Sequence, residues 1–515
     1  MIKYPIKTMK NKILFLLLFL LPVIVYAQKA EDYFNSGLSK AKIKDYKGAI
    51  EEFDKATKLD ANFAEAYNNR GLANAAMKNY KGAIIDYDKA IEIHPYYAEA
   101  YNNRGVTKQE QQNYQGALAD YNRALEINSM YAEVYNNRGV TKYYLHDFKG
   151  AIADYEKAVS INPIYAEAYN NMGVAKFYTK DYTGAVANYN QALEIKLSYA
   201  EVYYNRGIVN RMLLDYTGAI ADYSQAIDYA PMLAEAYNNR GVAKSKLKDD
   251  RGALADYNQA ISVNKKYAKA YFNRGLAKVC LSDYTGAVDD YNKALEFNSK
   301  DFEAYTSRGI AKAKLQKYQE AIEDYSYAIN INPEYEEAYN NRGVAYRNIN
   351  DYAKALADYD KTIELNTKDP EAYYNRGIVK YYSKDYQGAL ADYDKAIQLK
   401  PKLSEAYVYR GVVKSVLEDC KGAISDYNCA IQIRSDYDEA YYNRGVCKCK
   451  IQDFAGAITD FDKAIEFNAN YAEAYFNRGV AQMQLGQKEK ACSDFNKAGQ
   501  LGFYQAYDVI KQVCQ

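Results

Sequence analysis

Hydrophobic residues in this chain recur at helical spacing, in pairs of segments separated by a short polar turn. Between residues 79 and 92 they are three or four positions apart, which describes one face of an α-helix, at Tyr80, Ala83, Ile84, Tyr87, Ala90 and Ile91. The preceding residue, Asn79, is of a type that caps helices by accepting their first backbone N–H groups. A second helical segment precedes this one over residues 65–77. The pattern therefore predicts a helical hairpin.

The same pattern returns every 34 residues, without an insertion or deletion. Fourteen copies fill residues 30–505, and we number repeat positions 1 to 34 from Ala30. The first helix is expected over positions 2–14 and the second over positions 17–30. One such hairpin cannot bury its own apolar face, so this periodicity indicates a solenoid in which neighbouring repeats stack on one another.

Small and aromatic residues hold fixed places in the repeat. Position 8 is Gly and position 20 is Ala in all 14 repeats, while position 4 is always Tyr and position 24 is Tyr or Phe. A glycine inside a helix costs ~1 kcal/mol relative to alanine, so its recurrence requires a reason. We expect the two helices of each hairpin to approach closely where positions 8 and 20 meet.

These residues resemble the tetratricopeptide repeat family over about 476 of the 515 residues. The resemblance implies an all-α fold, a right-handed α-solenoid whose first helices line a concave groove, and binding of peptides or partner proteins there. This chain departs from the usual pattern at position 4 (Tyr for Trp), at position 11 (often Lys for Tyr) and at position 7 (Arg for Leu). After the repeats, residues 503–515 are expected to form a C-terminal capping helix.

The arginine at position 7 has a partner in the sequence. Position 7 is Arg and position 23 is Asp in 12 repeats each, and both differ in the same two repeats, as Ser36 with Glu52 and Met172 with Asn188. Antiparallel helices place these positions at similar heights. We therefore predict an ion pair within each hairpin, such as Arg70 with Asp86 and Arg240 with Asp256.

Residues 1–27 have the features of a secretory signal. Four lysines precede the apolar run ILFLLLFLLPVIV, and the small residue Ala27 follows it. An uncleaved anchor is the alternative, but this run is shorter than the ~20 residues that span a bilayer. Removing the segment would change the formal charge from +1 to −3. We expect an exported bacterial protein, periplasmic or secreted, without a membrane span after cleavage.

Residues suited to catalysis or metal binding are few. The two histidines, His94 and His146, fall in turns of different repeats. Positions 8 and 19 hold 25 of the 28 glycines, which leaves no Gly-rich phosphate-binding loop. We therefore expect no enzymatic activity, no cofactor and no metal site.

The balance of charge argues against a nucleic-acid partner. The chain has 67 basic and 66 acidic residues, whereas nucleic-acid-binding domains carry a basic patch or stripe. Position 2 is Glu in 13 repeats, where it would repel phosphates, although glutamate in a first helical turn also complements the helix dipole. Ligands of the groove are expected to be neutral or basic and partly aromatic.

Six of the seven cysteines lie in the last three repeats and the C-terminal segment. Cys447 and Cys449 point to different faces of a helix, which supports a metal site poorly. Disulfides are compatible with export, and Cys492 could join Cys514 across the cap. Buried free thiols are the alternative.

The groove is predicted at positions 2, 5, 6, 9, 12 and 13. The candidate binding residues are those at positions 5, 12 and 13: Asn68, Asn102, Asn136, Tyr143, Tyr144, Asn170, Phe177, Tyr178, Tyr204, Asn238, Phe272, Asn340, Tyr374, Tyr381, Tyr382, Tyr442 and Phe476. Asparagine could satisfy the backbone of an extended peptide. At position 6, Asn is expected instead to bond between neighbouring hairpins.

Together these features predict a non-enzymatic, exported scaffold that binds peptide or partner-protein segments. The alternative is a periplasmic component of an envelope or polysaccharide export and assembly complex.

Overall fold

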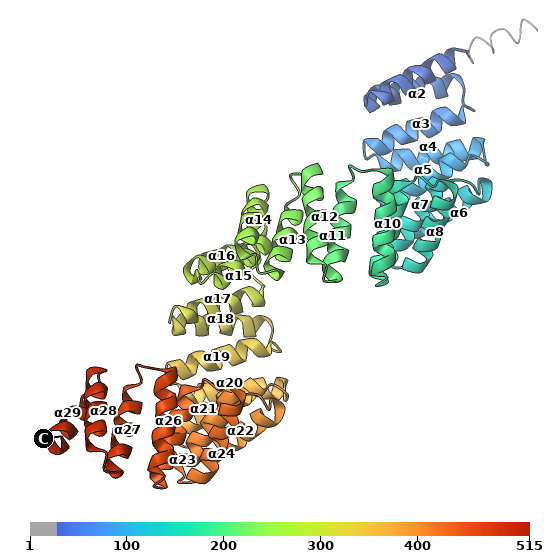
Figure 1. Cartoon of the computed structure of the whole chain (residues 1–515). Coiled ribbons are helices and arrows are strands. Elements are labelled where there is room, and N and C mark those ends of the chain that lie inside the picture. Colours follow the sequence, from blue (N-terminus) through green and yellow to red (C-terminus); the bar gives the residue numbers. More distant parts are fainter. Residues whose placement is uncertain (1–27, 515) are drawn as a thin grey trace, which may run out of the picture. The chain divides into compact units, whose positions relative to one another are not determined.

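The computed structural model describes residues 28–514, all of whose regular secondary structure is helical. The segment interpreted as a signal, residues 1–27, lies outside this range. The chain divides into two compact units, residues 1–263 and 264–515. Within each unit the helices are paired and stacked in tandem (Figure 1), as the 34-residue period predicts.

In the first unit, residues 28–42 are helical and precede thirteen further helices. These are α2 (Tyr46–Leu59), α3 (Ala64–Ala76), α4 (Tyr80–Ile93), α5 (Ala98–Glu110), α6 (Tyr114–Ile127), α7 (Ala132–Tyr144), α8 (Phe148–Ile161), α9 (Ala166–Tyr178), α10 (Tyr182–Ile195), α11 (Ala200–Met212), α12 (Tyr216–Tyr229), α13 (Ala234–Lys246) and α14 (Asp250–Val263). Odd-numbered helices are the first helices of their repeats, and even-numbered helices are the second.

The second unit continues the same alternation and ends with one additional helix. Its elements are α15 (Ala268–Cys280), α16 (Tyr284–Phe297), α17 (Phe302–Lys314), α18 (Tyr318–Ile331), α19 (Glu336–Asn348), α20 (Tyr352–Leu365), α21 (Pro370–Tyr382), α22 (Tyr386–Leu399), α23 (Ser404–Val416), α24 (Cys420–Ile433), α25 (Asp438–Lys450), α26 (Phe454–Phe467), α27 (Ala472–Gln484), α28 (Lys488–Gln500) and α29 (Gln505–Val513).

Two consecutive residues, at positions 15 and 16, set the turn inside each hairpin. Between α7 and α8, His146 has a left-handed φ of 60°, and the N–H of Asp147 donates to the carbonyl of Lys142 at 2.9 Å. This bond closes the end of α7. The Asp147 carboxylate then accepts from the N–H of Gly150 at 2.9 Å and caps α8.

The core of each hairpin is built around the ring at position 24. Tyr87 is fully buried, and a Cβ on Gly71 would lie only 2.6 Å from its Cε1 atom. The glycine therefore makes room for this ring. Positions 8 and 20 also lie close at Gly479, where the added Cβ would be 3.2 Å from the carbonyl oxygen of Ala491.

The arginine at position 7 forms a two-pronged ion pair with the aspartate of its own hairpin. Arg240 donates from Nη2 to Asp256 Oδ1 at 2.7 Å and from Nε to Oδ2 at 3.0 Å. Arg70 and Asp86 form the equivalent ion pair, with Nη2 and Oδ1 2.6 Å apart. In Arg376, the hydrogen bond to its hairpin aspartate raises the pKa of the guanidinium above its ordinary value, although burial acts in the opposite direction.

A third N–H of this arginine reaches the preceding repeat, which the sequence analysis did not anticipate. Nη1 of Arg240 donates to Ser224 Oγ at 3.0 Å, and Nη1 of Arg138 donates to Asn122 Oδ1 at 2.8 Å. The acceptor lies at position 25. Each such arginine thus ties its own hairpin together and also joins it to the neighbour.

Lysine at position 11 adds a second cation to the aspartate, as Lys244 does for Asp256 at 2.8 Å. In the fifth repeat, Met172 and Asn188 replace the arginine and aspartate, and both are buried. Asn188 Oδ1 has no hydrogen-bond partner within residues 28–514. One repeat thus folds with a neutral pair in this place.

The last helix closes the C-terminal end of the array. α29 packs through Ala506 and Ile510 on the cluster around Phe495, and Cys492 is disulfide-bonded to Cys514. The helix is shorter than the expected 503–515. Across residues 28–514, no helix is both long enough and apolar enough to cross a membrane.

Candidate functional site

Exposed tyrosines at position 13 mark the surface formed by the first helices. Tyr144, Tyr178 and Tyr382 are 53%, 53% and 54% exposed. Each lies nearly parallel to a ring at position 17 of the preceding repeat, with centroids 5.2–6.1 Å apart: Tyr144 on Tyr114, Tyr178 on Phe148 and Tyr382 on Tyr352. The stacking holds each exposed ring in place, so that its outer side is a preformed aromatic face.

The neighbouring rings at position 12 have a different role. Tyr143, Phe177 and Tyr381 are partly buried and pack against core residues of their hairpins. Burial raises the pKa of Tyr381, and Tyr382 and Tyr386 add to this shift. These residues support the exposed tyrosines, and their removal would disturb the core.

Asparagines at position 5 do not line an open groove, which corrects the sequence-based assignment. Asn68, Asn102, Asn136, Asn170 and Asn238 are buried, and Asn340 is partly buried. Asparagine at position 6 of the next repeat donates to this position, from Asn103 to Asn68 at 3.0 Å and from Asn137 to Asn102 at 3.1 Å. These side chains are therefore used between repeats and are not free to bind a peptide backbone.

Aromatic residues at position 5 are also partly internal. They lie at 5.5–6.2 Å, between ring centroids, from the position-24 ring of the same hairpin: Tyr204, Phe272, Tyr374, Tyr442 and Phe476. The hydroxyls of Tyr204 and Tyr442 accept a hydrogen bond from position 6 of the next repeat, as the buried asparagines do. One side of each ring therefore belongs to the core.

Two hollows on this surface contain one of the exposed tyrosines each. One, of about 490 Å³, lies in the second unit among α19, α20, α21 and α23 and includes Tyr382. The other, of about 210 Å³, lies in the first unit among α7, α8, α9 and α11 and includes Tyr144. A third hollow, of about 390 Å³, adjoins α17 and α19.

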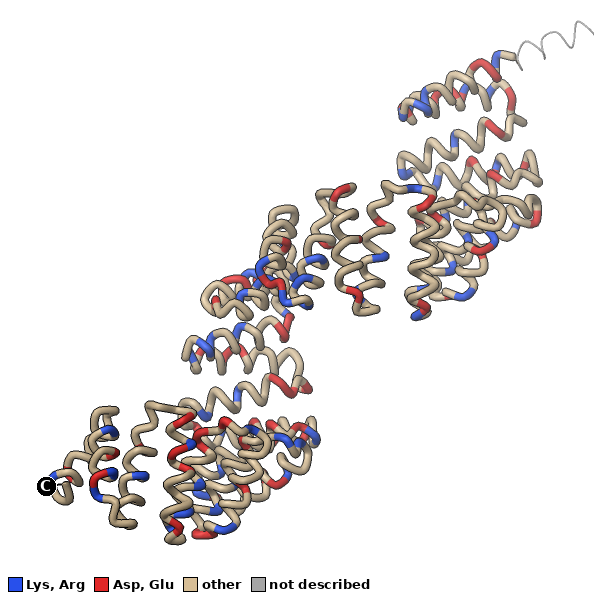
Figure 2. Tube along the Cα trace, in the orientation of Figure 1, with Lys and Arg blue, Asp and Glu red and all other residues tan. Residues whose placement is uncertain are grey.

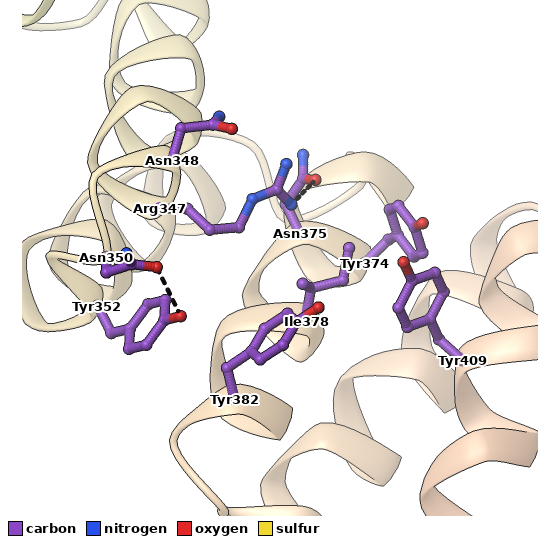
Figure 3. Close-up of a pocket in the computed structure, with 9 residues that line it drawn as sticks. All are labelled: Arg347, Asn348, Asn350, Tyr352, Tyr374, Asn375, Ile378, Tyr382 and Tyr409. Atoms are coloured by element: carbon purple, nitrogen blue, oxygen red, sulfur yellow. Dashed lines mark hydrogen bonds between the residues drawn. The ribbon is translucent and has the colours of Figure 1, made fainter. Parts of the chain in front are cut away.

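The first two hollows differ in charge. Arg347 is the only charged residue that lines the larger one, and Figure 3 shows it reaching from α19 toward Asn375. The smaller hollow has Glu201 as its only charged residue, which accepts a hydrogen bond from Asn170 at 3.2 Å. Arg347 and Tyr409 are not among the residues predicted from the sequence, although Tyr409 interrupts the series of asparagines at position 6.

The described residues offer no arrangement suited to metal binding. Within residues 28–514, no three His, Cys, Asp or Glu side chains are grouped so that they could hold an ion. Acidic and basic residues are interspersed along the helices of both units (Figure 2). The surface is thus characterised by aromatic rings with isolated charges.

Sequence models of the TPR repeat and of the tetratricopeptide repeat match most of the array. The matched residues are 37–78, 64–97, 98–131, 132–165, 175–212, 215–248, 234–267, 268–301, 311–350, 336–369, 370–403, 448–486 and 473–500. The chain belongs to the tetratricopeptide repeat family.

Several solved TPR structures are similar to parts or most of the chain. YrrB, described as a TPR protein with an unusual peptide-binding site, is 26% identical, with 37% of this chain and 99% of that chain covered and a TM-score of 0.33. A TPR protein from Parabacteroides merdae is 21% identical, with 48% and 99% covered and a TM-score of 0.40. The Cut9–Hcn1 hetero-tetramer is 13% identical, with 88% and 96% covered and a TM-score of 0.43. No curated protein sequence matches the chain.

TPR arrays bind protein or peptide partners and are typically non-enzymatic. Membership of the TPR family therefore supports the conclusion that this chain is a protein-interaction scaffold.

Proposed function

We propose that the chain is an exported scaffold that binds an extended segment of a partner protein along its first helices. The observation that carries this proposal is the set of three equally exposed, stacked tyrosines at position 13. Aromatic side chains held rigidly in this way supply contact area at little entropic cost and dominate many interfaces. Binding is expected in both units, because each contains such a tyrosine.

The test is affinity capture from a native envelope extract. Replacing Tyr144, Tyr178 and Tyr382 together by Ala removes the exposed rings and leaves the position-12 rings in the core. A matched control is Tyr327→Ala, because Tyr327 is 56% exposed and is stacked on Tyr305 at 5.4 Å, but lies on a second helix. We expect the triple variant to lose captured partners at least tenfold and the control to keep them.

Unchanged capture by the triple variant, with the same partners recovered, would place the binding surface elsewhere. Export is tested separately by fractionating the source cells and sequencing the mature N-terminus. A chain that begins at Gln28 in an extracytoplasmic fraction is expected, and an uncleaved chain in the cytoplasm would contradict this part of the proposal.

A further inference from the structure

The larger hollow contains one residue that departs from the repeat pattern and one that lies at a variable position of the repeat. Tyr409 occupies position 6 on α23, where most repeats have Asn, and Arg347 occupies position 12 on α19, where the neighbouring repeats have Ala313 and Tyr381. Tyr409 meets Tyr374 edge-on, with ring centroids 5.7 Å apart. Tyr409 thus replaces the hydrogen bond that an Asn side chain makes between repeats with a contact between two aromatic rings (Figure 3).

Arg347 differs from the arginines of position 7 in its partners. Within residues 28–514 its hydrogen bond is from Nη1 to Asn375 Oδ1, at 3.3 Å. No ion pair joins it to a carboxylate of residues 28–514, whereas Arg376 on the next first helix forms ion pairs with two aspartates. A guanidinium has five N–H donors in a planar fork, so most of this fork remains available.

Nearby acidic residues do not neutralise this arginine. Burial is the main cause that raises the pKa of Tyr374, Glu405 adds to the shift after Tyr409 and Tyr437, and Arg347 opposes it. The ion pair of Glu405, however, is with Arg434, at 3.6 Å. Glu439 likewise contributes, after burial, to raising the pKa of Tyr409. Neither carboxylate forms an ion pair with Arg347, so the hollow keeps one uncompensated positive charge among tyrosines and neutral amides.

We propose that this hollow binds an Asp or Glu side chain of the partner segment, with the carboxylate on Arg347. This inference rests on the proposed peptide-binding function and adds the chemistry of one contact. Arginine matches a carboxylate through two parallel N–H donors. The exposed face of Tyr382 and the side chain of Ile378 border the same hollow and would receive an apolar or aromatic residue next to the acidic one.

The hollow of the first unit provides an internal comparison. It also contains an exposed tyrosine, Tyr144, and an amide, Asn171, but its charged residue is Glu201. An acidic side chain would be repelled there. The two surfaces are therefore expected to prefer segments of opposite charge, and the general expectation of neutral or basic ligands applies to the first unit only.

The experiment uses a displayed library of random dodecapeptides, selected on the full chain. We expect enriched peptides that contain Asp or Glu beside an apolar or aromatic residue. For one synthesised acidic peptide, Arg347→Gln should raise the Kd at least tenfold, because hydrogen bonds to charged groups contribute about that factor or more. Changing the peptide carboxylate to an amide should raise the Kd by a similar factor. Making both changes together should raise the Kd little beyond the effect of either change alone.

Arg123→Gln is the matched control, because it removes one positive charge from a second helix, where Arg123 is paired with Glu126, and should leave the affinity for this peptide unchanged. Arg347→Glu should in turn bind the peptide in which Lys replaces the acidic residue. Thermal unfolding of each variant at the wild-type temperature shows that an observed loss is not due to misfolding.

The outcomes separate this inference from the function on which it rests. Enriched peptides without acidic residues, or acidic peptides that bind Arg347→Gln unchanged, overturn the inference while leaving peptide binding intact. A second probe, a uronic acid oligosaccharide, overturns it in favour of an acidic glycan if that probe binds through Arg347 and no peptide is enriched. If no peptide is enriched and partner capture is insensitive to the exposed tyrosines, both proposals are wrong.

Discussion

A double-mutant cycle on Arg240 and Asp256 tests whether the recurring pair acts as a unit. In the free chain the Asp256 side chain is 4% exposed and that of Arg240 is 19% exposed. Removing one member of a buried pair leaves the other charge uncompensated and costs ~3–5 kcal/mol, whereas exposed pairs contribute ~0–1 kcal/mol. The burial of this pair places it in the first class.

The two single variants should lose different amounts of unfolding free energy. Asp256→Asn leaves two cations without their carboxylate, because Lys244 also contacts Asp256 at 2.8 Å, so we expect a loss of ~3–5 kcal/mol. Arg240→Met leaves Asp256 paired with Lys244, and a smaller loss of ~2 kcal/mol is expected. The double variant reproduces Met172 and Asn188 of the fifth repeat and should recover much of the sum.

The assay should be local, because a long array need not unfold in two states. Hydrogen–deuterium exchange of the full chain, followed in peptides from α13 and α14, reports the opening free energy of this hairpin. Coupling of at least ~1 kcal/mol is expected for groups in direct contact. Strictly additive losses would mean that Arg240 and Asp256 do not stabilise the hairpin through each other.

Three further predictions concern turn, core and charge. Gly241→Ala should destabilise its hairpin by ~1–3 kcal/mol despite the higher helix propensity of Ala, because the new Cβ would lie 2.6 Å from Tyr257. If hydrogen exchange instead showed a higher opening free energy for the variant, the packing argument would be refuted. His146→Gly should stabilise its turn by up to ~1 kcal/mol, since the residue has a φ of 60°, and a lower melting temperature would contradict this. Burial raises the pKa of Asp222 in the folded chain. Above that pKa, ionisation of Asp222 therefore lowers the free energy of unfolding. This cost disappears as the pH falls below ~3.9, the pKa of Asp in an unfolded chain. Asn210→Lys supplies the cation that most repeats have at position 11 and should therefore raise the urea midpoint at pH 7 but not at pH 3. An equal gain at both pH values would contradict this electrostatic explanation.

The repeat architecture could be predicted from the sequence because its phase never changes. The glycine at position 8 is present in every repeat, the capping Asp or Asn at position 16 in 12 of 14, and the apolar spacing recurs in the same phase throughout, so each helix is specified many times over. The ion pair of the hairpin was also visible, since Met172 and Asn188 change together. The hydrogen bond from this arginine to the preceding repeat could not be predicted, because its acceptor at position 25 changes among Asp, Asn and Ser.

The candidate site was harder to predict than the fold. Asparagine at position 5 is polar and was assigned to an open surface, yet Asn68 is buried because Asn103 of the next repeat supplies its hydrogen bond. Stacking of Tyr382 on Tyr352 joins residues of two repeats at positions that have no shared sequence pattern. Such contacts depend on how successive hairpins lie on each other, which periodicity alone does not specify.

The third hydrogen bond of the position-7 arginine determines which pieces of the chain are interchangeable. Its strong pair is internal to one hairpin, while its link to the neighbour accepts any of three side-chain types, as at Asp360, Asn122 and Ser224. At this one contact, a repeat can therefore be duplicated, deleted or transplanted without a matched change in its neighbour. The junction before the fifth repeat is the exception, because Met172 offers no donor there. Apolar packing of the buried Met172 beside Tyr155 and stacking of Tyr178 on Phe148 join the two repeats at that junction instead.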